Sequence, residues 1–427
     1  MSLPTKYSHW AKVLSKFLSI EIIVQGLNVL IGIWLVRALS QKEYAYYTIA
    51  IGMLSTISLM SDSGISFGMT SIGGKVWQDR FRFGQLINTA MRMRYSLAIV
   101  SIAVVSPVLI WMLARNGAPW SYTIIITLIV LVGANFQLTS GVLMTVPRLH
   151  SQIRVIQNLD LLSNLVKFFL LGIGYLTVLN AAVATATTAA AFAVYRFGLG
   201  NFAPKKIDTT ASQNPEDRQE ILKIVKRTAP NTVFYCFQGQ ITLLLLSLFG
   251  NVQNIAEIGA LGRLTLVFTI ISSVLGNIIL PSFARCQSHR ILLKRYFLIL
   301  LGSALFSVFL IVLSILFPHQ ILWILGGKYK HLESELVLVI LSAGLNFIAS
   351  VMWSLNSSKA WLDGVMFQIP GTLIVQVLGI MFLNLSTLHG VILFSMCPLV
   401  QSFILNSFMS YRGLREKAMQ ESSGNAV

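Results

Sequence analysis

The chain has 427 residues, of which 55% are hydrophobic and only 11% are charged, and its formal net charge is +17. Soluble proteins carry about 25% charged residues, so the composition excludes a soluble protein with one membrane anchor. A membrane-spanning helix needs about 20 mostly apolar residues, so a dozen spans use most of the chain. Little of the chain is therefore left for a domain outside the membrane.

Twelve apolar windows follow one another along the chain. The first is too long for the apolar part of a signal peptide and is predicted to be a retained helix. The windows lie at about 17–37, 44–62, 93–114, 119–145, 155–176, 179–199, 229–250, 260–283, 296–317, 333–353, 365–384 and 387–410.

The predicted fold class is all-α, a polytopic membrane protein of about 12 transmembrane helices in two six-helix bundles around a central cavity. The longest polar stretch separates the bundles. We expect an N-terminal bundle at 1–200, a cytoplasmic linker at 201–228, a C-terminal bundle at 229–410 and a cytoplasmic tail at 411–427.

The linker contains a helix-start signal. Residues 214–217 (Asn-Pro-Glu-Asp) read as an N-cap, a first-turn proline and an acidic first turn. We predict a short amphipathic helix lying on the membrane surface, with Ile221, Leu222 and Val225 turned toward the lipid.

The cationic residues are divided unequally between the two sides of these spans. With the N-terminus in the cytoplasm, 25 Lys and Arg fall in the tails and loops of the cytoplasmic side. The opposite side has five, namely Arg37, Lys42, Arg115, Lys328 and Lys330. This is the positive-inside pattern of a membrane protein. It accounts for the net charge without a nucleic-acid partner and places both termini in the cytoplasm.

The two halves resemble each other in layout. Gln25-Gly26 aligns with Gln238-Gly239, and both pairs lie midway through the first helix of their half. Six helices per half, both entering from the cytoplasm, predict a parallel repeat whose halves enclose a cavity and rock to expose it to each side in turn. Coincidence among apolar sequences is the competing explanation.

Polar residues recur at helical spacing inside the apolar windows. Glu21, Gln25 and Asn28 form one stripe, as do Asp160, Asn164 and Lys167, and Gln238 stands in the corresponding helix of the second half. Such spacing puts each set on one helix face, which favours a hydrated interior. The alternative is that the amides hydrogen-bond neighbouring helices together.

Charged groups within the spans are the strongest candidates for function. Lys167 is the best single candidate, because it lies too near the membrane centre to reach the surface. Arg37, Arg92, Arg94 and Arg263 could pass an anionic head group across in stages, although interfacial snorkelling explains the first three as well. Together with Gln25, Asn28, Asn164 and Gln238, these cations are the predicted substrate-binding residues.

Three acidic residues are predicted to couple transport to an ion. They are Glu21, Asp62 and Asp160. Asp62 precedes Ser63-Gly64, so it could instead cap the following turn. We find no Walker-type loop and no His or Cys metal spacing, and therefore expect no ATP hydrolysis, no metal and no cofactor beyond a coupling H+ or Na+.

Several short strings are similar to those of the polysaccharide exporter family, including O-antigen flippases, within the multidrug/oligosaccharidyl-lipid/polysaccharide exporter superfamily. The resemblance covers nearly the whole chain. It rests on residues 35–44 (LVRALSQKEY), 61–65 (SDSGI), 280–285 (LPSFAR) and 324–329 (ILGGKY). The outer turn usually has glycine after the tyrosine in such proteins, whereas Ala45 stands here.

The resemblance implies a flippase of the bacterial inner membrane. Its substrate would be an undecaprenyl-pyrophosphate-linked oligosaccharide repeat unit, moved from the cytoplasmic to the periplasmic leaflet for O-antigen or a similar lipopolysaccharide or surface polysaccharide. Membrane lipids, a polysaccharide polymerase and a chain-length regulator are the partners implied. An ion-coupled multidrug exporter of the same superfamily and a membrane-embedded polymerase are the alternatives. The outer loops are too short for a polymerase.

Overall fold

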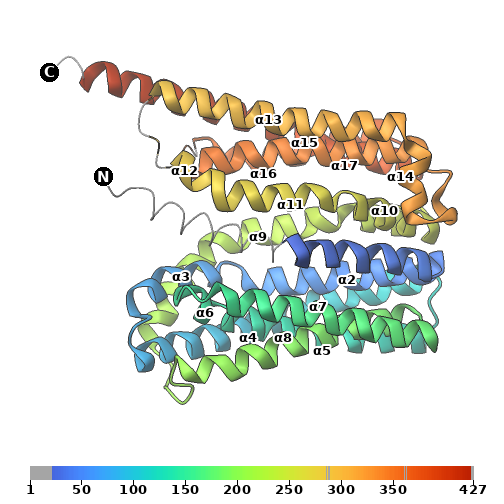
Figure 1. Ribbon diagram of the computed structural model, residues 1–427, viewed down its shortest axis with the longest axis horizontal. Coiled ribbons are helices and arrows are strands. Elements are labelled where there is room, and N and C mark those ends of the chain that lie inside the picture. Colours follow the sequence, from blue (N-terminus) through green and yellow to red (C-terminus); the bar gives the residue numbers. More distant parts are fainter. Residues whose placement is uncertain (1–21, 285, 287–288, 360, 362, 425–427) are drawn as a thin grey trace, which may run out of the picture. The chain divides into compact units, whose positions relative to one another are not determined.

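The computed structural model describes residues 22–284, 286, 289–359, 361 and 363–424. These residues are almost entirely helical and form two compact units. In each unit the long helices lie side by side along a common direction (Figure 1). The predicted all-α polytopic fold is confirmed.

Unit 1 comprises Met1–Ser247 and Asn251–Ala256. Its described helices are Ile22–Ala38, α2 (Gln41–Asp62), α3 (Ile65–Val76), α4 (Arg80–Arg115), α5 (Trp120–Leu143), α6 (Thr145–Leu149), α7 (Ile153–Leu176), α8 (Ala181–Phe202), η1 (Ala203–Lys205) and nearly all of α9 (Pro215–Phe249).

Unit 2 comprises Leu248–Gly250 and Glu257–Val427. It contains most of α10 (Val252–Leu264), then α11 (Leu266–Val274), the π-helical turn η2 (Leu275–Ile279), α12 (Leu280–Ala284), α13 (His289–Leu316), α14 (Pro318–Leu325), η3 (Gly327–Tyr329), α15 (Glu333–Ser358), η4 (Val365–Phe367), α16 (Gln368–Phe382) and α17 (Leu388–Gly424).

Each of the twelve apolar windows contains helix. Among the described residues, ten helices are long and apolar enough to cross a membrane, and the bent pair α2–α3 is an eleventh candidate. The helix Ile22–Ala38 is apolar but shorter, and the preceding residues lie outside the described part of the chain. α17 continues through the expected cytoplasmic tail as far as Gly424.

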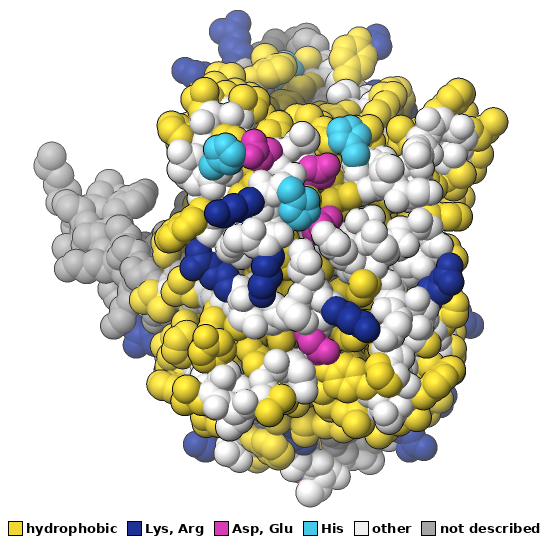
Figure 2. Space-filling view, turned by 90° about the vertical axis from the view of Figure 1, so that its right-hand side faces the viewer, with side chains coloured by type: hydrophobic (Ala, Val, Ile, Leu, Met, Phe, Trp, Pro, Cys, Tyr) yellow, Lys and Arg dark blue, Asp and Glu magenta, His cyan; other side chains and the backbone are white. Residues whose placement is uncertain are grey.

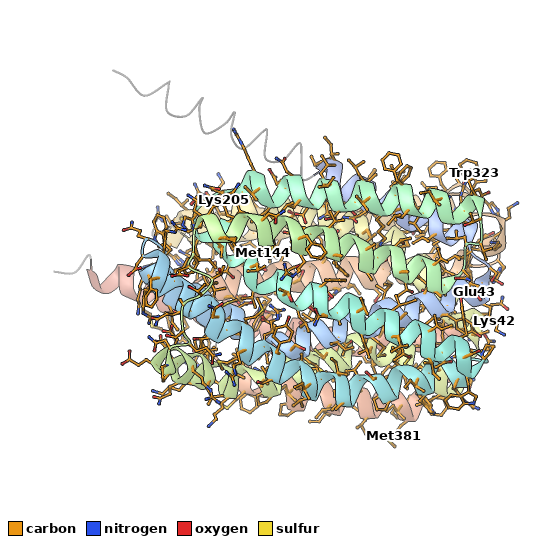
Figure 3. The ribbon with its side chains drawn as sticks, turned by 90° about the horizontal axis from the view of Figure 1, so that it is seen from below. Lys42, Glu43, Met144, Lys205, Trp323 and Met381 are labelled. Carbon is orange, nitrogen blue, oxygen red and sulfur yellow. The ribbon has the colours of Figure 1, made fainter. Side chains whose placement is uncertain are left out.

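The turn that precedes α2 in unit 1 is organised by Glu43. Its Oε2 accepts hydrogen bonds from the Tyr122 hydroxyl at 2.5 Å and from the Ala181 amide at 2.7 Å. The Ala181 amide is one of the unpaired donors that begin every helix, so Glu43 joins the start of α2 to those of α5 and α8. Figure 3 shows Lys42 and Glu43 at one end of the unit and Lys205 at the other.

Helix α9 differs from the linker that we predicted. The helix does begin at Pro215, but it continues through Pro230 to Phe249 as one element, rather than as a separate surface helix followed by a span. Ile221 and Val225 are buried in the hydrophobic core of unit 1, where Ile221 touches α3 at Gly68. The prediction that both face lipid is therefore wrong, because they pack against α3 and α4 instead; Leu222 alone of the three is exposed.

The start of α9 is fastened to α4 by an ion pair. Arg82 donates from both terminal nitrogens to Asp217, at 2.5 and 2.6 Å, and the Asp217 side chain is 3% exposed. Two-point pairing of a guanidinium with a carboxylate is among the stronger polar contacts in proteins.

Asp217→Asn should lower the free energy of unfolding by about 1–2 kcal/mol, because it removes the counter-charge of Arg82 while that guanidinium still reaches water. Thermal denaturation of the detergent-purified protein measures the change. Glu220→Gln, an exposed acid one turn further along α9, should have almost no effect. Equal losses in both variants would contradict the assignment.

Unit 2 is held together near one end by a buried polar network. The Asn356 side-chain amide donates to the Asn406 carbonyl at 3.0 Å, and Ser410 donates to Asn356 Oδ1 at 2.8 Å. The Tyr296 hydroxyl lies 2.6 Å from the Ser410 hydroxyl. These contacts link α13, α15 and α17, as interhelical hydrogen bonds do in other membrane bundles.

The opposite end of unit 2 gathers histidines and carboxylates. His331 Nε2 lies 2.8 Å from Glu257 Oε1, and His319 Nδ1 lies 2.9 Å from Glu333 Oε1. Figure 2 looks onto this end of the molecule, where histidine side chains lie beside acidic ones. Within the described residues, no group of His, Cys, Asp and Glu is arranged to hold a metal ion.

Candidate functional site

The candidate site of unit 1 lies where the second span breaks. α2 ends at Asp62, and α3 starts at Ile65 with a bend of 49° between them. Ser63 and Gly64 both adopt left-handed conformations, with φ of 36° and 100°. Left-handed residues end helices because they turn the chain off the helix axis, so the Ser-Gly pair sets the bend.

The break is bonded to α9. The Thr228 hydroxyl donates to the Ser63 carbonyl at 2.6 Å, and a Cβ placed on Gly64 would lie 2.2 Å from the Thr228 oxygen. Only glycine therefore fits at position 64. On the other side of the break, the Ser66 hydroxyl donates to Asp62 Oδ1 at 2.6 Å and holds the carboxylate in place.

Asp62 forms an ion pair with Arg94 of α4. Arg94 Nη1 lies 3.4 Å from Asp62 Oδ1, and the two side chains are 6% and 22% exposed respectively. A guanidinium this deeply buried needs a nearby counter-charge. The structure thus brings together one predicted substrate-binding residue and one predicted ion-coupling residue.

The surroundings of Arg94 give its charge little other compensation. The guanidinium lies directly against Gly141 of α5, where a Cβ would come within 2.4 Å of Nη1. Arg94 Nε and Nη1 are buried and make no hydrogen bond. Gln137, one turn before Gly141 on α5, likewise has a buried Oε1 without a hydrogen-bond donor. Buried polar groups in proteins are nearly always hydrogen-bonded and are costly when they are not, so these exceptions make the surroundings of Arg94 a candidate functional site.

Lys167 lies on the inward face of α7. It is four residues after Ser163 and four before Leu171, both buried, and therefore shares their face. The strongly exposed Leu162, Phe169 and Ile173 lie on the other side of the helix. Lys167 itself is half-buried, and no carboxylate of the described residues pairs with it.

The remaining members of the two polar stripes have mixed surroundings. Asn164 and Asp160 are half-buried, and the Asn164 side chain donates to the Asp160 carbonyl at 2.9 Å, so this amide is satisfied within its own helix. Asn28 is half-buried on the face that buries Val24 and Ile31. Gln25 is also half-buried, and Glu21 lies outside the described residues.

The other predicted residues do not join the Asp62–Arg94 pair. Arg37 is exposed at the end of the first helix, and Arg92 is exposed on α4. Gln238 is half-buried on α9, and Arg263 is half-buried at the end of α10 in unit 2. The sequence analysis missed Ser66, Gly141 and Thr228. Ser66 contacts Asp62 across the break, whereas Gly141 and Thr228 contact residues of other helices, and such contacts leave no pattern in the sequence.

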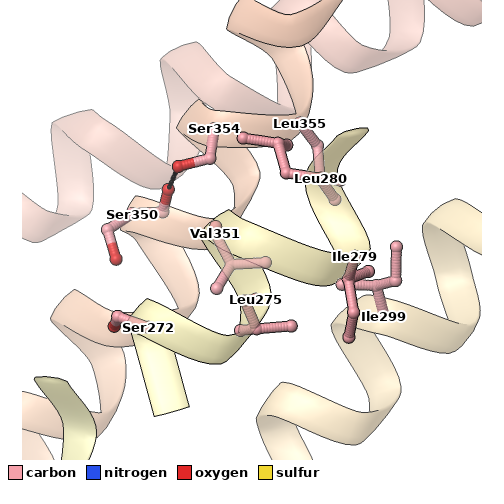
Figure 4. A pocket seen from close by; sticks show the side chains of 10 residues that line it. Ser272, Leu275, Ile279, Leu280, Ile299, Ser350, Val351, Ser354 and Leu355 are labelled. Atoms are coloured by element: carbon pink, nitrogen blue, oxygen red, sulfur yellow. Dashed lines mark hydrogen bonds between the residues drawn. The ribbon is translucent and has the colours of Figure 1, made fainter. Parts of the chain in front are cut away.

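Unit 2 has a small cavity of its own beside the π-helical turn. Its volume is about 60 Å³, and it is lined by apolar side chains together with Ser272, Ser350 and Ser354 (Figure 4). The Ser354 hydroxyl donates to the Ser350 carbonyl at 2.8 Å, so the helix backbone already satisfies it. Since π turns are often found where membrane helices bend or bind, this cavity is a secondary candidate.

The fold defined by these spans is that of membrane transporters of known structure. An inward-facing MATE-family multidrug resistance transporter of the MOP superfamily aligns over 92% of this chain and 96% of its own length, with a TM-score of 0.70 and 13% identity. An outward-facing structure of a MATE-family transporter of the same superfamily aligns over 96% and 94%, with a TM-score of 0.61 and 16% identity.

The lipid II flippase MurJ, in an inward closed conformation, has a TM-score of 0.74 with 12% identity, covering 94% of this chain and 90% of its own. No family model and no curated protein sequence matches the chain. At these identities the likeness shows that the chain has the transporter fold shared by MATE proteins and MurJ.

Proposed function

We propose that the protein is a flippase that moves an undecaprenyl-pyrophosphate-linked oligosaccharide repeat unit, for O-antigen or a similar polysaccharide, from the cytoplasmic to the periplasmic leaflet of a bacterial inner membrane. The observation that carries this proposal is Lys167, a half-buried cation on the inward face of α7 and near the middle of its span. An intramembrane cation without a carboxylate partner among the described residues calls for an anionic substrate.

The proposed mechanism is alternating access by two helical bundles. A pyrophosphate would be paired with Lys167 through charge-assisted hydrogen bonds, while the polyprenyl chain remains in the lipid. Gln25, Asn28, Asn164 and Gln238 are proposed to bind the sugars. The cations Arg37, Arg92 and Arg263 are proposed to guide the head group at the two ends of the path.

Ion coupling is proposed to act through Asp62. Its carboxylate is 22% exposed, which leaves it open to a proton or Na+, and Arg94 is its partner. Occupying or protonating Asp62 would remove the counter-charge of a buried guanidinium and so favour movement at the α2–α3 break. Asp160 and Glu21 are proposed as further coupling sites.

Lys167→Ala should reduce transport roughly tenfold to a hundredfold, the kinetic equivalent of losing one hydrogen bond to a charged group. Purified protein in liposomes, supplied with a fluorescent polyprenyl-diphosphate sugar, measures the rate. Lys167→Arg should retain most of it, and Lys75→Ala, an exposed cation on α3, should retain all of it. Undiminished transport by Lys167→Ala would remove this residue from the mechanism.

The second candidate is an ion-coupled multidrug exporter, favoured by the likeness to MATE-family transporters. Exporters of cationic drugs need an acidic side chain free to meet the drug. In this chain Asp62 is already paired with Arg94. Expression in a drug-sensitive host separates the candidates: increased drug resistance without any lipid-linked sugar transport would favour the exporter.

A further inference from the structure

A groove in unit 2 combines cations with an apolar floor. It lies between α12 and the start of α13, has a volume of about 690 Å³, and is open on one side. The apolar lining includes Phe283, Ile291 and Leu298, and the cations are Arg290, Lys294 and Arg295. No acidic side chain is among the lining residues.

The three cations differ in their contacts. Arg295 donates from Nη1 to the hydroxyl and the carbonyl of Ser282, at 3.2 and 3.3 Å, and so ties the two walls of the groove together. Arg290 and Lys294 are exposed and one turn apart, and no ion pair of the described residues involves them. α13 also begins here at His289, so its backbone dipole adds positive potential. The groove is therefore complementary to a phosphate.

The same face of α13 continues as an apolar stripe. Exposed side chains follow Lys294 at spacings of three and four residues, namely Leu298, Leu301, Leu305, Val308 and Val312. At about 1.5 Å per residue, this stripe extends the groove by roughly 25 Å along the helix. A molecule with a phosphate head and long acyl chains matches both parts.

We propose that this groove binds an anionic glycerophospholipid of the surrounding bilayer, with the lipid phosphate on Arg290 and Lys294 and its acyl chains along the α13 stripe. Basic pockets at the ends of transmembrane helices are known sites for such head groups. The proposal requires only that α13 spans the membrane and does not depend on the transported substrate.

Abundance favours the bulk lipid over a lipid-linked diphosphate. Occupancy follows the ratio of ligand concentration to dissociation constant, and anionic phospholipids are major components of bacterial membranes, whereas a lipid-linked intermediate is scarce. One phosphate diester also needs only the two free cations that the groove offers.

The test uses the full-length protein in detergent, titrated with a short-chain phosphatidylglycerol while its unfolding temperature is measured. Phosphatidylcholine with the same chains is the neutral comparison. The wild type should be stabilised by phosphatidylglycerol selectively, and less so at high salt. Arg290→Gln/Lys294→Gln should bind phosphatidylglycerol roughly thirtyfold more weakly, since each cation near an anionic lipid contributes about one factor of five.

The matched control is Lys223→Gln/Lys226→Gln, which removes two exposed cations one turn apart on α9. It should keep the affinity of the wild type. Unchanged affinity in the groove variant, or an equal loss in the control, would overturn the proposal. Displacement of phosphatidylglycerol by an equimolar amount of undecaprenyl diphosphate would overturn the choice of occupant. Because binding is measured without transport, failure here leaves the proposed function untouched.

Discussion

Asp62→Asn is expected to lower the free energy of unfolding by about 3 kcal/mol, because it leaves the Arg94 guanidinium buried without a counter-charge. Asparagine keeps the oxygen that accepts from Ser66, so the loss is mainly electrostatic. Thermal denaturation of the purified protein measures the effect.

Replacing Arg94, the other partner of the ion pair, should lower the free energy of unfolding by less. Arg94→Met removes the buried charge and leaves Asp62, which is 22% exposed and can still be hydrated. The double variant Asp62→Asn/Arg94→Met should recover much of the stability lost in Asp62→Asn, because replacing a buried ion pair with neutral groups is often close to neutral. Arg92→Met, an exposed arginine two residues away, is the control. Additive losses in the double variant would show that the two side chains are not coupled.

Gly64→Ala is expected to destabilise the protein by about 2–4 kcal/mol for two separate reasons. A φ of 100° is strained for any residue with a Cβ. The new Cβ would also lie 2.2 Å from the Thr228 oxygen and would displace the hydrogen bond to Ser63. The same thermal measurement applies, together with the transport rate, because this position joins the break to α9.

A second variant separates the two reasons. Adding Thr228→Ala to Gly64→Ala should relieve the steric part and leave the backbone strain. Gly74→Ala on α3 is the control, since nothing lies within 4 Å of its Cβ and the position is an ordinary helical one. It should be neutral or slightly stabilising. If both glycine variants behaved alike, the special geometry of the break would be disproved.

Much of the fold could be predicted from the sequence, because hydropathy is a local property and the bilayer admits few solutions. All twelve apolar windows contain helix. In the structure, the predicted stripe residue Lys167 lies on the side of α7 away from the exposed Phe169, and its role stays a prediction. The helix-start signal at 214–217 also marked the true start of α9. Its end was misjudged, because α9 continues through Pro230 to Phe249 as one helix.

The sequence alone determined the class of protein: a polytopic helical membrane protein with intramembrane charges, since composition and apolar run length depend on no contact. Only the tertiary structure decided which charges meet. Asp62 and Arg94 are 32 positions apart, and Thr228 reaches Ser63 from a helix much later in the chain. When a helix is apolar on all sides, its sequence does not show which face points toward its neighbours. Packing against the neighbouring helices therefore sets these pairings, and it also buries Ile221 and Val225.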